Sequence, residues 1–122
     1  MRETDDADGS ETLDEAALMT LVGGSRELAV ELAELYLDDL EPRVNEITAA
    51  VRERDAGRLR AAAHALRGSS GSLRARNVSA AAGALEEMAR SLELDGIEQA
   101  LNQLNFALAS LRPRLVELAG RA

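Results

Sequence analysis

The sequence predicts an all-α fold, an antiparallel four-helix bundle preceded by a short additional helix at its N-terminal end. Leu and Ala dominate the apolar residues, and Tyr36 and Phe106 are the only aromatic ones, a composition that favours helices over a sandwich or barrel. Only Pro42 and Pro113 interrupt the helical segments. A chain of 122 residues suits one domain with a single aliphatic core.

The chain opens with a polar, acidic stretch, residues 1–11, which has no periodic apolar positions. We predict a disordered tail there and a helical bundle domain over residues 12–120. Thr12 and Glu15 have the spacing of a capping box. They predict a short first helix that ends at the glycine pair beginning with Gly23.

The second and third helices have clear start signals. Ser25 is placed to cap the second helix, whose apolar residues keep helical spacing through Pro42 as far as Arg54. Asp55 is the predicted N-cap of the third helix. One long second helix and a separate third helix are therefore expected.

Two further helices complete the predicted bundle. Asn77 or Ser79 is expected to begin the fourth helix, and Asp95 the fifth. Pro113 is expected to bend or loosen the fifth helix. Short connections between the helices predict antiparallel neighbours.

His64, the only histidine, lies in the predicted third helix. At about 100° per residue, the residues of its core face lie within about 60° of one direction. These residues are Leu59, Ala62, Ala63, Leu66, Ser70 and Leu73. His64 lies about 140° from this face, so its imidazole is expected to be exposed.

Small and basic residues surround His64 at the helical positions three, four and seven residues away. They are Gly57, Arg60, Ala61, Arg67, Gly68 and Gly71. A glycine inside a helix costs about 1 kcal/mol relative to alanine. Two interpretations follow: the helix ends at Gly68 and a loop follows, or the helix continues and the glycines clear the surface for a partner.

Charge is distributed unevenly along the chain. The net charge of −8 argues against nucleic acid as a partner, because phosphate backbones need a basic surface. Residues 52–76, however, contain seven arginines and only two acidic residues. Arg60, Arg67 and Arg74 repeat every seven residues beside His64. Such a stripe is either a solubilising surface or a set of guanidinium groups for an anion on the imidazole.

The chain lacks the residues that several classes of functional site require. Without cysteine there is no disulfide, thiolate nucleophile or Cys-based zinc site. A single histidine without a carboxylate on its own helical stripe predicts no metal site, no hydrolytic triad and no cofactor. No apolar run of membrane-spanning length and no signal peptide is found, so the cytoplasm is the expected location. Covalent carriage of a group on a neutral imidazole nitrogen remains.

The segment AHALRGSSGSLRA, residues 63–75, resembles the signature of histidine-containing phosphotransfer (HPt) domains. That signature is His, any residue, Leu, Lys or Arg, Gly, Ser and a small residue, then Leu-Gly-Ala. The matching residues are His64, Leu66, Arg67, Gly68, Ser69, Ser70, Leu73 and Ala75. The order of helices is similar from Thr12 to Leu118. The family commonly has Gly where this chain has Arg74, a difference that affects packing or partner contact.

The resemblance implies that His64 accepts a phosphoryl group from the aspartyl phosphate of a response-regulator receiver domain and passes it to another receiver aspartate. Mg²⁺ is implied in the receiver and not in this chain. Arg67 is implied to neutralise the phosphoryl oxygens, and Ser69 to hydrogen-bond near them. The surroundings of the phosphoryl site and the receiver-docking surface are implied to be Arg60, Ala61, Gly68, Ser69, Gly71 and Arg74.

Two other classes of protein place a histidine on a bundle helix or expose apolar helix faces. The phosphoacceptor helices of sensor histidine kinases follow their histidine with an acidic residue and, about five residues on, a proline, whereas Ala65 and Ser69 stand here. No ATP-binding domain fits in this length, so no autokinase activity is expected, and a hybrid histidine kinase is instead a candidate partner of a monomeric carrier. The second alternative is a non-catalytic helical adaptor whose groove binds a partner helix, with His64 incidental.

Overall fold

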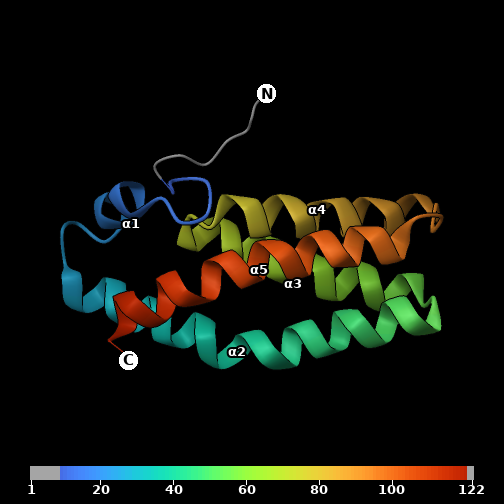
Figure 1. Cartoon of the computed structure of the whole chain (residues 1–122), viewed down its shortest axis with the longest axis horizontal. Coiled ribbons are helices and arrows are strands. Elements are labelled where there is room, and N and C mark those ends of the chain that lie inside the picture. Colours follow the sequence, from blue (N-terminus) through green and yellow to red (C-terminus); the bar gives the residue numbers. More distant parts are fainter. Residues whose placement is uncertain (1–8, 121–122) are drawn as a thin grey trace.

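The computed structural model describes residues 9–120 and confirms the predicted fold class. Within that range the chain forms five α-helices and no strand. The helices are α1 (Glu15–Leu21), α2 (Arg26–Glu53), α3 (Ala56–Leu73), α4 (Arg76–Ser91) and α5 (Ile97–Ala119). Figure 1 shows the four long helices lying along one another, with α1 at one end of the bundle.

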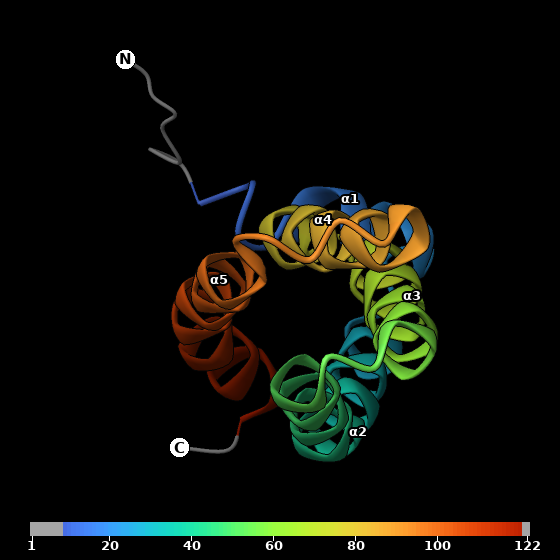
Figure 2. The same cartoon turned by 90° about the vertical axis from the view of Figure 1, so that its right-hand side faces the viewer.

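The four long helices follow one another around the bundle. In the end-on view of Figure 2, α3 lies between α2 and α4, and α5 completes the ring between α4 and α2. Short connections make successive helices antiparallel. Because α3 and α5 are diagonally opposite, the long helices that border α3 are α2 and α4.

Two predicted start signals are confirmed. Ser25 Oγ accepts a hydrogen bond from the backbone N–H of Leu28 at 3.1 Å, and the Asp55 carboxylate accepts one from the N–H of Arg58 at 3.1 Å. Helix α2 continues through Pro42, as expected. These side chains therefore satisfy free N–H groups of the first turns.

The predicted start of the fourth helix is wrong. Helix α4 begins at Arg76, ahead of Asn77 and Ser79, and its N-cap Ala75 offers no side-chain hydrogen bond. The backbone N–H of Asn77 instead donates to the carbonyl oxygen of Glu11 at 2.8 Å. The segment before α1 thus supplies the acceptor that a capping side chain would otherwise provide.

The first and fifth helices also differ in detail from prediction. The N-cap of α1 is Asp14, not Thr12, and its carboxylate accepts a hydrogen bond from the backbone N–H of Ala17, the third residue of the helix. Helix α5 begins after Gly96, which has a φ of 80°, and not at Asp95. It continues past Pro113 to Ala119. The left-handed conformation at Gly96 favours glycine and lets the chain enter α5 abruptly.

The predicted N-terminal tail lies largely outside the described residues, which begin at Gly9. Its last residues are bonded to the bundle. Arg114 Nη1 donates to the carbonyl oxygen of Gly9 at 2.9 Å, and the backbone N–H of Leu13 donates to the same oxygen at 3.0 Å. The chain entering α1 is therefore tied to α5.

The core is aliphatic, with one polar pair inside it. Leu and Ala side chains from all five helices fill the interior. Ser70 is fully buried, and its Oγ lies 2.7 Å from the hydroxyl of Tyr36. Burial raises the pKa of Tyr36 above its usual value, so the phenol stays protonated and can share this hydrogen bond. Over residues 9–120, no helix combines the length and apolar character that crossing a bilayer requires.

Arg74→Gly is expected to raise the free energy of unfolding by about 0.5–1 kcal/mol. Arg74 follows α3 with a φ of 72°, a left-handed conformation that is costly for a residue with a Cβ. Its Nη1 donates to the carbonyl of Gly71 at 3.0 Å, which offsets part of that cost. Urea denaturation measures the difference, and a lower stability of the variant would contradict the expectation.

Candidate functional site

Helix α3 is unbroken from Ala56 to Leu73. The interpretation in which the helix continues through Gly68 and Gly71 is therefore confirmed, and the one in which it ends at Gly68 is wrong. The predicted core face of α3 is buried apart from Ala62, which is partly buried. His64 points away from that face, and its side chain is 64% exposed. The imidazole is thus accessible to a partner.

Glu86 of α4 reaches the imidazole from the neighbouring helix. Its Oε2 lies 2.8 Å from His64 Nδ1, and its Oε1 lies 2.7 Å from Arg67 Nε. The Glu86 side chain is only 16% exposed, much less than the histidine. One carboxylate therefore connects both side chains that the sequence placed at the centre of the site.

These contacts determine which nitrogen of His64 carries the proton. Arg67 Nη2 lies 3.3 Å from Nδ1, but Nδ1 cannot accept a hydrogen bond from Arg67 while it donates one to Glu86. The contact with Glu86 is the shorter one and joins a donor to a carboxylate. We therefore assign the proton to Nδ1, which leaves Nε2 with its lone pair free to act as a nucleophile.

The ionisation of Glu86 supports this assignment. Partial burial raises the pKa of Glu86, but the hydrogen bond with His64 and the positive charges of Arg67 and Arg60 lower it by more. The resulting pKa lies below the usual value for a glutamate. Glu86 is accordingly an ionised acceptor at neutral pH.

Some of the predicted surrounding residues lie beside the imidazole. Arg60 and Ala61 line, with His64 and Glu86, a shallow hollow of about 320 Å³. Gly68 is exposed, and a Cβ placed on it would meet no atom within 4 Å. The surface around the ring is therefore open on the side of Gly68, as expected.

Gly71 has a different environment. A Cβ on Gly71 would lie 3.4 Å from Ser79 Oγ, so this glycine faces α4. Gly71 therefore does not leave an open surface beside the imidazole.

The structure separates Ser69 and Arg74 from the imidazole. Ser69 Oγ donates to the carbonyl of Leu66 at 3.3 Å. Arg74 lies past the end of α3 and turns back to the carbonyl of Gly71. The predicted stripe of three arginines is therefore wrong at Arg74, because the helical spacing stops at Leu73.

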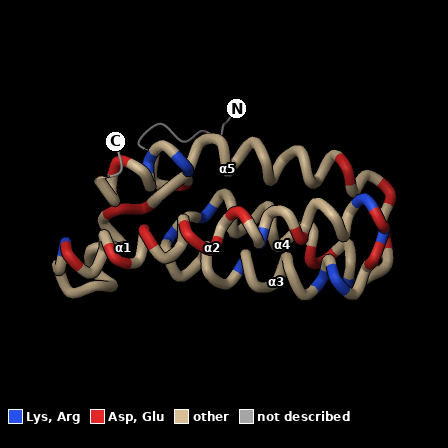
Figure 3. Tube along the Cα trace, turned by 90° about the horizontal axis from the view of Figure 1, so that it is seen from below, with Lys and Arg blue, Asp and Glu red and all other residues tan. Residues whose placement is uncertain are grey.

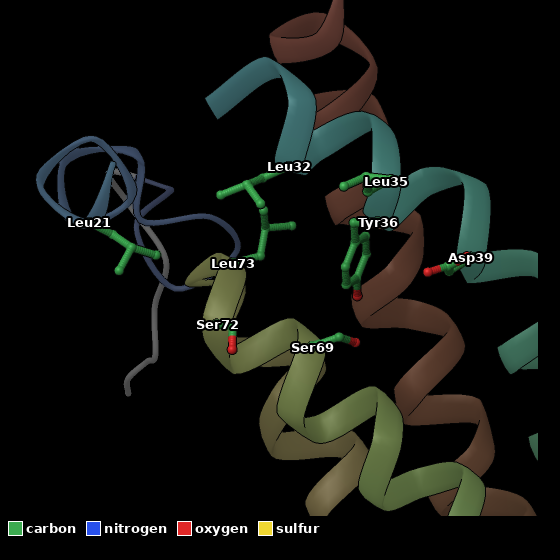
Figure 4. A pocket seen from close by; sticks show the side chains of 8 residues that line it. All are labelled: Leu21, Leu32, Leu35, Tyr36, Asp39, Ser69, Ser72 and Leu73. Carbon is green, nitrogen blue, oxygen red and sulfur yellow. The ribbon is translucent and has the colours of Figure 1, made fainter. Parts of the chain in front are cut away.

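An apolar groove lies between α1, α2 and the last turns of α3. It has a volume of about 290 Å³, and Figure 4 shows its side chains converging from the three helices. The lining residues are Leu21, Leu32, Leu35, Tyr36, Asp39, Ser69, Ser72 and Leu73. Leu35 is 61% exposed. Ser69, which lines the groove, lies on the same helix as His64, so α3 contributes to both the groove and the site.

Comparison with known proteins identifies the family. The family model of the Hpt domain matches residues 31–114, which include most of α2, all of α3 and α4 and most of α5. The chain belongs to the Hpt domain family. This Hpt domain is similar to the crystal structure of histidine-containing phosphotransfer protein B (HptB) from Pseudomonas aeruginosa PAO1. The identity is 27% and the TM-score 0.82, over 91% of this chain and 96% of that chain. No match was found among curated proteins.

Sequence reasoning missed Glu86 as a part of the site. Helical spacing reveals only the neighbours of His64 on its own helix, whereas Glu86 comes from α4, 22 residues further along the chain. One signal was present. Glu86 follows the buried Leu85, at the edge of the apolar face of α4 that packs on α3. An acidic residue at such an edge is placed to reach a basic residue on the adjacent helix.

Proposed function

We propose that His64 of this Hpt domain accepts a phosphoryl group from the aspartyl phosphate of a receiver domain and passes it to an aspartate of another receiver. The family match and the likeness to HptB support a phosphotransfer intermediate in a phosphorelay. The observation that carries the proposal is the exposed imidazole with its Nδ1 held by Glu86. An accessible nucleophilic nitrogen is what a carrier needs.

The reaction uses the lone pair of Nε2. Nε2 attacks the phosphorus of the aspartyl phosphate, an N–P bond forms, and the P–O bond to the aspartate breaks. The aspartate leaves as a carboxylate and no proton moves. The ring becomes cationic, and its Nδ1–H then faces the carboxylate of Glu86, which stabilises that charge. Transfer to a second receiver reverses these steps.

The second requirement is a positive group that neutralises the negative charge of the phosphoryl oxygens. Arg67 carries its guanidinium within 3.3 Å of the ring, so a small rotation brings it to a phosphoryl oxygen on Nε2. We expect Mg²⁺ to be bound by the receiver and not by this chain. Because one chain supplies His64, Arg67 and Glu86, a monomer is sufficient.

A label-transfer experiment tests the proposal. The chain is mixed with a receiver domain carrying a labelled aspartyl phosphate, and label should appear on the chain as an acid-labile, base-stable phosphoprotein. Incubation with labelled ATP alone should give none. Label that never leaves a panel of receivers would overturn the proposal and favour the helical adaptor. Labelling from ATP would contradict the expected lack of kinase activity.

Leu35→Glu is expected to weaken receiver binding. Leu35 is the most exposed apolar residue of the groove, to which the helix of His64 also contributes. A charge there should raise the half-saturating receiver concentration about tenfold and leave the plateau transfer rate unchanged. Stopped transfer reactions over a series of receiver concentrations give both quantities.

Phe106→Glu is the matched control for Leu35→Glu. Phe106 is 78% exposed, also apolar, and lies on α5, diagonally opposite α3. Figure 3 shows that charged residues on α5 are confined to its ends, so Phe106, in the middle of this helix, lies in a neutral stretch. An equal effect of the two substitutions would exclude the groove as a specific contact.

A further inference from the structure

The side chain of Arg67 crosses α4 at a glycine. A Cβ placed on Gly83 would lie 3.1 Å from Arg67 Cδ and 3.9 Å from Arg67 Cγ. The first distance is shorter than normal van der Waals contact between carbon atoms. The path of the Arg67 side chain therefore depends on the absence of a side chain at position 83.

Two other residues of α4 hold the ends of Arg67. Ser79 Oγ donates to the backbone carbonyl of Arg67 at 3.0 Å, and Glu86 Oε1 binds its Nε at 2.7 Å. Ser79, Gly83 and Glu86 are spaced by four and three residues, so they form one stripe of α4 that faces α3. This stripe contacts the backbone, the middle and the head of Arg67 in turn.

We propose that Gly83 is a positioning residue for phosphotransfer, which keeps open the space through which Arg67 reaches Glu86 and His64. The proposal rests on the function proposed above. It extends the site to a residue that touches neither the imidazole nor the phosphoryl group. Gly83 acts only through Arg67.

The lower helix propensity of glycine supports a positioning role for Gly83. Gly83 lies in the interior of α4, where alanine is the better helix former. A methyl group at position 83 would push Arg67 away by a few tenths of an ångström. Since Ser79 and Glu86 fix both ends of Arg67, the displacement strains the contact with Glu86 or moves the guanidinium from His64.

A graded series of substitutions tests the proposal. Gly83→Ala should lower the plateau transfer rate about threefold and Gly83→Val about tenfold or more, at an unchanged half-saturating receiver concentration. Gly83→Ala should nevertheless raise Tm by about 2–5 °C, because it improves the helix. Ala84→Val, an exposed neighbour on the same helix, is the matched control and should leave transfer unchanged.

A double-mutant cycle with Arg67→Ala decides whether Gly83 acts through Arg67. In the Arg67→Ala background, neither substitution at Gly83 should change the rate further. If each substitution slows transfer by the same factor in both backgrounds, the side chain at 83 obstructs the receiver directly and the proposal is overturned. Unchanged transfer by Gly83→Val in the original background would also overturn it.

A spectroscopic measurement separates this proposal from the proposed function. The N–H resonance of Arg67 Nε should show its ion pair with Glu86 in the original chain and lose that signature in Gly83→Val. If the chain accepts no phosphoryl group, the proposed function fails while the resonance still reports on the contact. If the resonance does not respond to Gly83→Val, the contact does not depend on Gly83.

Discussion

His64→Gln is expected to abolish acceptance of a phosphoryl group while leaving the fold unchanged. Glutamine has an amide in place of the imidazole and offers no nucleophilic nitrogen. The loss should exceed about 1,000-fold, the limit set by background labelling, because no second histidine exists in the chain. Acid-labile, base-stable phosphoprotein formed from a labelled receiver is the measured quantity.

The fold of His64→Gln should be retained because the side chain is largely exposed. Circular dichroism and the urea midpoint provide the control, and the midpoint should change little. Phosphoprotein of the same acid and base stability in His64→Gln would place the acceptor elsewhere and refute the central assignment.

Arg67→Ala is expected to slow phosphotransfer by about 10- to 100-fold. The substitution removes the guanidinium nearest the ring and leaves the charge of Glu86 unbalanced beside an incoming anion. The plateau rate should fall more than the half-saturating receiver concentration rises, since the interaction strengthens as the N–P bond forms.

Arg67→Lys separates charge from geometry. Lysine keeps the positive charge but lacks the planar fork that binds Glu86 through Nε, so it should recover only part of the rate. A rate unchanged in Arg67→Ala, with the fold intact by circular dichroism, would remove Arg67 from the mechanism.

Contacts within one helix could be predicted from the sequence, whereas contacts between helices could not. The periodicity of α3 gave its buried face and the exposure of His64, because both depend only on angles around one axis. Side-chain caps such as Ser25 and Asp55 were likewise local signals. Each of these caps involves a side chain and a backbone N–H only three residues apart.

The contact of Glu86 with His64 and the start of α4 depend on tertiary structure, so neither could be predicted from the sequence. The carboxylate of Glu86 reaches His64 only because α4 packs on α3 in one register. The N-terminus of α4 is satisfied by a backbone carbonyl, an acceptor that every residue possesses and that no sequence pattern marks. The same holds for Gly83, whose importance depends on an arginine from another helix.

The position of His64 on a single exposed face has a consequence for the order of events. In the proposed relay, a donor receiver and an acceptor receiver both need the same nitrogen, so they compete for one surface and cannot be bound together. Transfer must then proceed by exchange: the donor departs before the acceptor arrives, and the phosphorylated carrier exists free in between. An excess of unphosphorylated receiver would consequently hold the carrier unloaded and slow the relay that it serves.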